Sequence, residues 1–199
     1  MTVKELLENP KYIKYIDENE FAECYDALMR EFRADFTRML LDEGINPLQY
    51  MHIIPRNFLD SETEAIFIPS NITKIGQEAF IGCVMLKDVH ISEGVNTIDT
   101  LAFGDCVRLD EITIPNTVRD IKQWAFAGCF SLEKVHLGKS IEFIGNYAFK
   151  ECVKLTSISY GGTIEDWANV HVKGHAFADC PVDTIQCSDG ITSIYTFED

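Results

Sequence analysis

One phrase of amino acids recurs along the middle of the chain at a constant spacing. Four columns of residues keep a step of 23 positions: Phe80, Phe103, Phe126 and Phe149; Cys83, Cys106, Cys129 and Cys152; Leu86, Leu109, Leu132 and Leu155; and Ile75, Ile98, Ile121 and Ile144. A fixed period in the twenties indicates a solenoid, because one short unit cannot bury its apolar side alone and must stack on its neighbours. The chain is therefore predicted to form stacked coils with one continuous apolar core.

Each unit can be interpreted locally. Val89-His90-Ile91 and its equivalents alternate apolar, polar and apolar residues, which predicts a half-buried strand. Pro69 and Pro115 come directly after such strands, where the missing backbone N–H of proline disturbs the hydrogen bonds between strands least. The stretch from Ile75 to Phe80 predicts one or two helical turns, and Gly82 suits a left-handed end to them.

The repeated phrase also resembles a known family. Its clearest copy contains Ile114-Pro115, Ile121, Ala125-Phe126 and Gly128-Cys129, and this pattern resembles the BspA-like class of bacterial leucine-rich repeats. The resemblance extends from about Ile53 to Gly190. It implies an α/β repeat fold, a curved right-handed solenoid with parallel strands on one face. It also implies a binding or adhesion role, and no catalytic residues come with the motif.

The two ends of the chain differ from the repeats. Residues 1–52 are predicted to form an N-terminal all-helical cap, and residues 53–199 the solenoid. The cap carries an apolar stripe at helical spacing, formed by Phe21, Tyr25, Leu28, Phe32, Phe36 and Met39. Its layout resembles helical leaders of intracellular, often phage-encoded, repeat proteins. At the far end Phe177 follows Phe149 by 28 positions, so the last repeat holds a five-residue insertion, from which Trp167 is expected to plug the core.

Composition and net charge limit the cellular compartment and the classes of partner that we expect. The net charge is −15, and acids are spread over the whole chain, so direct binding to nucleic-acid phosphates is not expected. No apolar run approaches the ~20 residues that span a bilayer, so no membrane insertion is expected. Residues 1–7 do not form a signal peptide, and the seven cysteines suggest no disulfide framework. We therefore expect a cytoplasmic protein whose cysteines are mostly core residues.

The strand-lined face is the predicted binding site. If Val89 and Ile91 point inward, the polar residues between them point outward, and the same holds in each repeat. The candidate partner-binding residues are Phe67, Asp88, His90, Glu111, Thr113, Lys134, His136, Ser157 and Ser159. A strip of six strands is wide enough for one protein-sized contact.

Chemistry-bearing motifs are scarce, so we expect no enzyme and no cofactor. No nucleophile elbow, phosphate loop or metalloprotease helix is present. His171, His175, Cys180 and Cys187 have spacing reminiscent of a zinc site, but packing already explains both thiols, and no metal is expected.

Two functions remain open from the sequence. The first is a protein-protein interaction module that uses a rigid repeat surface. The alternative is an acidic decoy that imitates nucleic acid and blocks a nucleic-acid-binding protein. The column Asp88, Glu111, Lys134 and Ser157 loses its negative sign halfway, which disfavours the decoy. The partner's identity and the oligomeric state are not set by the sequence.

Overall fold

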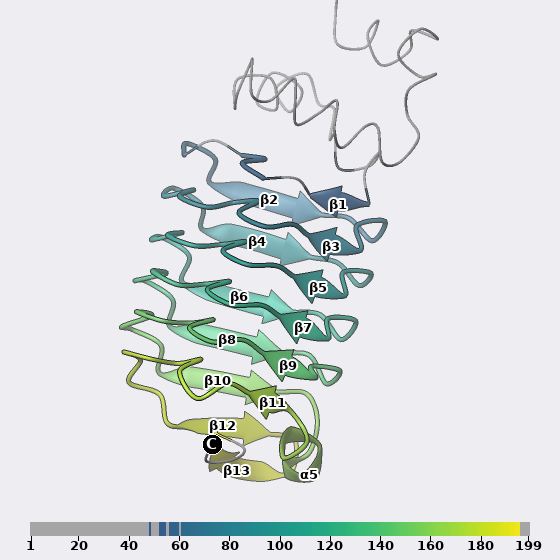
Figure 1. The fold of residues 1–199 in the computed structure, drawn as a ribbon, viewed down its shortest axis with the longest axis vertical. Helices are drawn as coiled ribbons and strands as arrows, with labels where there is room; N and C mark the ends of the chain where they lie inside the picture. The colour runs from purple at the N-terminus through teal and green to yellow at the C-terminus, as the bar shows by residue number, and fades with distance from the viewer. Residues whose placement is uncertain (1–47, 49–51, 55, 60, 196–199) are drawn as a thin grey trace, which may run out of the picture.

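The chain forms a solenoid of stacked coils (Figure 1). A computed structural model describes residues 48, 52–54, 56–59 and 61–195. The predicted helical cap, residues 1–52, lies almost wholly outside the described residues, so its helices remain a prediction. The predicted solenoid of parallel strands is confirmed over the described part of the chain.

Each coil contributes one long and one short strand. The long strands are β2 (Ala65–Ile68), β4 (Asp88–Ile91), β6 (Glu111–Ile114), β8 (Lys134–Leu137), β10 (Ser157–Tyr160) and β12 (Thr184–Cys187). The short strands are β1 (Ile53–Ile54), β3 (Lys74–Ile75), β5 (Thr97–Ile98), β7 (Asp120–Ile121), β9 (Phe143–Ile144) and β11 (His171–Val172). The short strands form one parallel sheet of six. The long strands pair as β2-β4 and as β6-β8-β10-β12, so their hydrogen-bonded ladder is interrupted between β4 and β6.

The phenylalanine column is the centre of the core. Phe80, Phe103, Phe126 and Phe149 are completely buried, as the period predicted. Successive rings stack on one another with centroids 5.0, 5.1 and 5.1 Å apart, and Phe177 continues the stack at 5.2 Å. Each coil therefore buries its largest side chain against the neighbouring coils rather than within itself.

The segment after each short strand is not helical, and the prediction of helical turns from Ile75 to Phe80 is wrong. Alternate backbone N–H groups donate to the next coil, as Phe103 N does to Ala125 O at 2.8 Å. The N–H groups between them donate to a carbonyl three residues back, as Gly104 N does to Leu101 O at 3.1 Å, rather than to one four residues back. A left-handed residue also interrupts each turn. Glu78, Leu101, Trp124 and Tyr147 occupy this position with φ of 56–62°. A bulky side chain there is strained, and stacking of Trp124 on Tyr147, with centroids 4.5 Å apart, gives some compensation.

The insertion in the last repeat closes the solenoid at its C-terminal end. A short helix, α5 (Ile164–Trp167), begins with a reciprocal capping box between Thr163 and Asp166. It buries Trp167 as expected, and the indole Nε1–H donates to the carbonyl of Ser193 at 3.1 Å. Ser193 ends β13 (Gly190–Ser193), which pairs antiparallel with β12. The reversal of strand direction ends the parallel stack, and Trp167 satisfies a carbonyl at its edge.

The first described coil is incomplete. β1 pairs with β3, and Phe58 is fully buried against Phe80 in an edge-to-face contact with centroids 6.3 Å apart. Residues 52–54 and 56–59 therefore supply part of a coil that covers the start of the phenylalanine column.

Replacing a stacked core ring will destabilise the whole solenoid. We expect Phe126→Ala to lower the free energy of unfolding by about 3–5 kcal/mol, because it leaves a cavity between two stacked rings. Phe130→Ala is the matched control in the same coil, since Phe130 is 43% exposed, and should cost less than about 1 kcal/mol. Urea unfolding followed by circular dichroism measures both. Equal effects of the two substitutions would contradict this account of the core.

Candidate functional site

The predicted site residues all lie on the outward side of the long strands. Two of them, His136 and Ser159, are half-buried. The other seven are exposed: Phe67, Asp88, His90, Glu111, Thr113, Lys134 and Ser157. Parallel pairing aligns them into two columns along the solenoid: Thr113 lies opposite His136, which lies opposite Ser159, and Glu111 lies opposite Lys134, which lies opposite Ser157. The strands therefore bring these residues together as neighbours on one rigid surface.

A shallow groove of about 550 Å³ lies on this face. It runs across β4, β6, β8 and β10, and its lining includes four of the nine predicted residues: His90, Thr113, His136 and Ser159. The other five lie outside the groove. Phe67 adjoins it, since its ring stacks on that of His90 with centroids 4.9 Å apart and planes 4° apart. Phe67 is 54% exposed, which leaves an apolar ring available beside the groove.

The groove wall beyond the strand ends was missed by the sequence analysis. Glu93 accepts hydrogen bonds from the backbone N–H groups of Asn116 and Thr117 at 3.2 and 3.0 Å. Asn116 in turn accepts from the N–H of Lys139 at 3.1 Å, and Tyr160 donates to the carbonyl of Lys139 at 2.8 Å. Each bond links one coil to the next. The loops that border the groove are therefore held in place, and the 23-residue spacing of Glu93, Asn116 and Lys139 is the signal that identifies them.

A carboxylate, an imidazole and a hydroxyl lie in line on the same face. Glu111 Oε1 is 3.3 Å from His136 Nε2, and His136 Nδ1 is 2.7 Å from Ser159 Oγ. This order of groups is also found in serine hydrolases. Glu111 reaches His136 diagonally, because its direct partner on β8 is Lys134.

The surroundings of these three groups do not favour acyl transfer. A hydrolase needs N–H donors that point at a developing oxyanion. In β8 and β10 the backbone N–H groups lie in the plane of the sheet and bond to neighbouring strands on both sides. The line of groups is therefore best understood as a set of contacts that orders three side chains across three strands.

Opposite charges interrupt the acidic columns. Lys134 lies 3.8 Å from Glu111, and Lys87 lies 3.6 Å from Asp110 in the next coil. Asp88, by contrast, has no ion-pair partner among the described residues. The face therefore has a mixed charge pattern, in which Asp88 on β4 is an exposed carboxylate without an ion-pair partner among the described residues.

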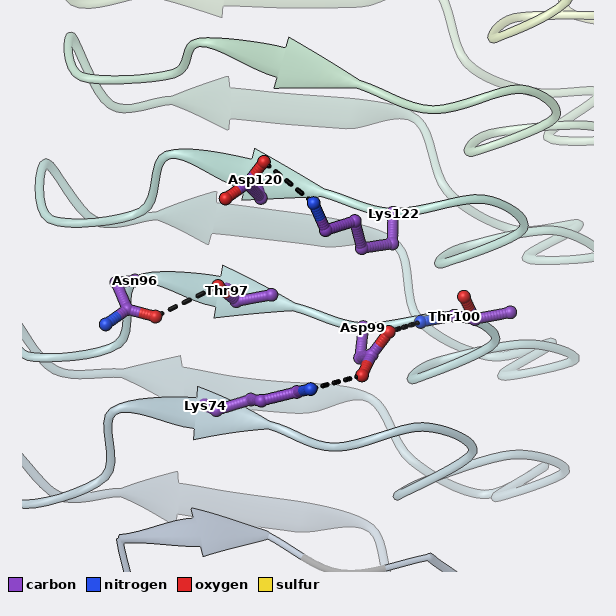
Figure 2. Close-up of polar contacts among 7 residues, drawn as sticks. All are labelled: Lys74, Asn96, Thr97, Asp99, Thr100, Asp120 and Lys122. Carbon is purple, nitrogen blue, oxygen red and sulfur yellow. Dashed lines mark hydrogen bonds and ion pairs between the residues drawn. The ribbon is translucent and has the colours of Figure 1, made fainter.

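The short-strand sheet presents a second charged surface (Figure 2). Asp99 accepts from Lys74 of the preceding coil at 2.6 Å and from the backbone N–H of Thr100 at 2.7 Å. In the coil after Asp99, Lys122 pairs with Asp120 at 2.9 Å. Burial raises the pKa of Asp99, but the hydrogen bonds from Lys74 and Thr100, together with the nearby lysine charges, outweigh it and lower the pKa below its ordinary value. These charges of both signs are largely paired, so we assign this surface to coil-to-coil stabilisation.

The four residues with zinc-like spacing are distributed over different elements. His171 lies on β11, His175 stacks on Tyr147, Cys180 occupies the cysteine column, and Cys187 lies on β12. In the part of the chain that the structure describes, no three His, Cys, Asp or Glu side chains gather as a metal site. No helix in the same part has the length and apolar character needed to cross a membrane.

The cysteine column is a core element with one accessible end. Cys106, Cys129 and Cys152 each donate to the carbonyl of a phenylalanine in the preceding coil, at 3.2–3.3 Å. Burial raises the pKa of Cys129 to about 12 and also raises that of Cys106. Cys180 is only partly buried, and its hydrogen bond with the Cys152 thiol lowers its pKa despite some desolvation.

Acid will weaken the solenoid through Asp99. Because the folded-state pKa of Asp99 lies below its unfolded value of about 3.9, its stabilisation is complete above that value and is lost as the pH falls towards the folded pKa. We expect Asp99→Asn to cost up to about 1 kcal/mol at pH 7 and to show a smaller loss of stability below pH ~4 than the unmodified protein. Asp88→Asn is the control. Urea titrations from pH 7 to 3 test this, and parallel curves for both variants would contradict it.

Thiol chemistry will select Cys180. In a Cys24→Ser background, Ellman's reagent at pH 8 should modify one thiol fast, because Cys180 is the one described cysteine that is not buried. Cys180→Ala should remove this fast phase, and the buried thiols should react only when the chain unfolds. A fast phase that survives in Cys180→Ala would contradict the assignment.

One solved structure supports the fold, and two others are similar to parts of the chain. Pneumococcal vaccine antigen PcpA matches with a TM-score of 0.54 and 23% identity, over 73% of this chain and 35% of PcpA. A leucine-rich cell surface protein from Faecalibacterium prausnitzii matches with a TM-score of 0.49 and 25% identity, over 60% of this chain and 38% of that protein. A T. pallidum leucine-rich repeat protein matches with a TM-score of 0.46 and 22% identity, over 68% of this chain and 77% of that one. The chain thus covers well under half of the first two proteins.

The sequence matches a family as well. No protein of curated function matches the chain. The model of the BspA type leucine-rich repeat region matches residues 52–180 in six copies. These residues are well over half of the chain and contain the phenylalanine, cysteine and leucine columns described above, so the protein belongs to the BspA-type leucine-rich repeat family.

Proposed function

We propose that this protein is a non-enzymatic protein-binding module that meets its partner with the strand-lined face. The observation that carries the proposal is the groove over β4, β6, β8 and β10, beside which the exposed ring of Phe67 stacks on His90. Leucine-rich repeats commonly serve protein binding, and a rigid concave or flat surface lowers the entropy lost on association.

The distribution of residue types supports a binding role over a catalytic one. The recurrent residues of each coil are used in the core, and the outward positions vary freely from coil to coil. The line Glu111–His136–Ser159 orders polar groups without oxyanion donors above the sheet. Such ordered donors and acceptors suit recognition of a partner's polar groups.

The acidic-decoy function receives less support. A nucleic-acid mimic presents regular negative charge, whereas Lys134 and Lys87 pair with the acids beside them. For location we propose the cytoplasm, because a reducing compartment suits the free thiols Cys106, Cys129, Cys152, Cys180 and Cys187.

Affinity capture from the source cell tests the proposal. A tagged full-length chain is compared with Asp88→Lys/Glu111→Lys, which reverses two charges on the strand-lined face. The matched control is Glu165→Lys/Asp183→Lys, which makes the same change in net charge at exposed positions away from that groove. We expect quantitative mass spectrometry to show a specific protein that is retained by the control and reduced at least fivefold by the strand-face variant.

Two results would count against the strand-lined face. Equal retention by both variants would move the contact elsewhere on the surface. The absence of any protein enriched above background would remove the binding-module proposal itself.

A further inference from the structure

Two cysteines in neighbouring coils lie side by side at the C-terminal end of the cysteine column. Cys152 and Cys180 each follow a stacked phenylalanine by three positions, and the rings of these two phenylalanines have centroids 5.2 Å apart. A backbone bond holds the two coils in register beside the cysteines, because Glu151 N donates to Ala178 O at 3.0 Å. The Cα atoms of the two cysteines are therefore about 5 Å apart, which is within the range that a disulfide bridges.

The Cys180 thiol is directed towards the preceding coil. Its Sγ donates to the carbonyl of Phe149 at 2.9 Å, whereas the corresponding bonds of the three preceding cysteines in the column are 3.2–3.3 Å long. The same carbonyl accepts the backbone N–H of Cys152 at 3.2 Å, and the two thiols also hydrogen-bond to each other. Neighbouring coils are ~4.8 Å apart and the Cβ atoms of a disulfide about 3.8 Å, so a bond between the sulfurs requires the coils to approach by about 1 Å.

A small reagent can reach only the last thiol of this column. Cys180 is half-buried, whereas the other thiols of the column are at most 1% exposed: Cys83, Cys106, Cys129 and Cys152. In the part of the chain that the structure describes, no further parallel coil follows Cys180, and the strand after its coil, β13, runs antiparallel. A reaction with a reagent in solution therefore begins at Cys180, and Cys152 is the thiol beside it.

The two thiols differ in how readily they ionise. The hydrogen bond with the Cys152 thiol lowers the pKa of Cys180, and it outweighs partial burial and the negative charge of Asp179, which raise it. The same hydrogen bond, together with complete burial, raises the pKa of Cys152. The pair thus combines an accessible thiol that forms a thiolate with a buried thiol that keeps its proton. Cysteines that sense oxidants have this arrangement, a reactive thiol next to a resolving one.

We propose that Cys180 and Cys152 form a redox modification site, which a hydroperoxide converts into an intramolecular disulfide. In the first step the Cys180 thiolate attacks one oxygen of hydrogen peroxide, the O–O bond breaks, and the leaving hydroxide takes up the proton that the thiol released. Cys180 is then a sulfenic acid. In the second step the Cys152 sulfur attacks the Cys180 sulfur, the S–O bond breaks, and the leaving hydroxide takes the proton of Cys152. Two electrons pass from the thiols to the peroxide, two waters form, and a thiol reductant restores the pair by exchange.

This site is separate from the proposed partner surface, because neither cysteine lines the strand-face groove. Cys180 follows Cys152 by 28 positions, and the segment between them contains α5 with Trp167. The disulfide would therefore join the last coil to the preceding one and close a loop around the segment that ends the solenoid.

Peroxide treatment followed by mass spectrometry tests the proposal. The reduced full chain in a Cys24→Ser background is treated with hydrogen peroxide at neutral pH, and its remaining thiols are then blocked with N-ethylmaleimide under denaturing conditions. We expect a monomer that carries two maleimide groups fewer than the untreated chain. Peptide mapping should show one disulfide, between Cys152 and Cys180, and dithiothreitol should restore both thiols.

Three variants separate the roles of the two thiols. Cys180→Ala should lower the yield of disulfide at least tenfold. Cys152→Ala should leave a sulfenic acid on Cys180, with at least fivefold more dimedone adduct than the parent chain gives. Cys129→Ala is the matched control, since it removes a thiol of the same column one coil earlier, and should change the disulfide yield less than about twofold. Circular dichroism confirms folding of each variant, and the peptide map of the parent chain decides the question if a core variant is unfolded.

Several results would overturn the proposal. One is a disulfide that links Cys180 to Cys187, or that links two chains. Others are oxidation of Cys180 to a sulfinic acid while Cys152 stays reduced, and a Cys180 thiol that peroxide leaves unchanged. Equal disulfide yields from the parent chain and Cys180→Ala would also exclude this site.

Discussion

Contact between neighbouring coils is the interaction on which the rest of this structure depends. No coil has an interior of its own: its phenylalanine ring packs between two other rings about 5.1 Å away. Its cysteine thiol and its turn N–H groups bond to the coils on either side. Because every bond is made with the same register, each coil must have nearly the same length, and the one longer coil places its extra residues in α5, at the end of the stack.

A structure built this way must terminate, because an unpaired coil exposes both apolar surface and backbone donors. At the C-terminal end, β13 reverses direction and Trp167 fills the core while its indole N–H satisfies the carbonyl of Ser193. At the other described end, β1 and Phe58 cover the first complete coil. Both ends of the solenoid are thus closed by the interactions that also join the repeats, aromatic packing and backbone hydrogen bonding, but in a different geometry.

The surface inherits its order from the core. Packing fixes which positions of each coil point inward. The positions that point outward are therefore aligned from coil to coil in regular columns, and their residue types differ between coils. On the long strands these columns give a groove with ordered polar groups. Beside the turns they leave the apolar side chains of Val84, Phe130 and Val153 exposed.

The 23-residue period by itself determined which residues face inward and the outward placement of residues such as Asp88 and His136, whereas the parallel strands were implied by the resemblance to leucine-rich repeats. The period reveals these positions because the same positions are buried in every coil, so the same apolar residue types recur there. The turns were not predicted correctly, because Ile75 to Phe80 suits helical turns locally, whereas in the structure alternate N–H groups such as that of Phe80 donate to carbonyls of the neighbouring coil. The diagonal contact of Glu111 with His136, the groove wall at Glu93 and the exposure of Phe130 were likewise decided by tertiary structure, because each depends on distances between coils that are far apart in sequence.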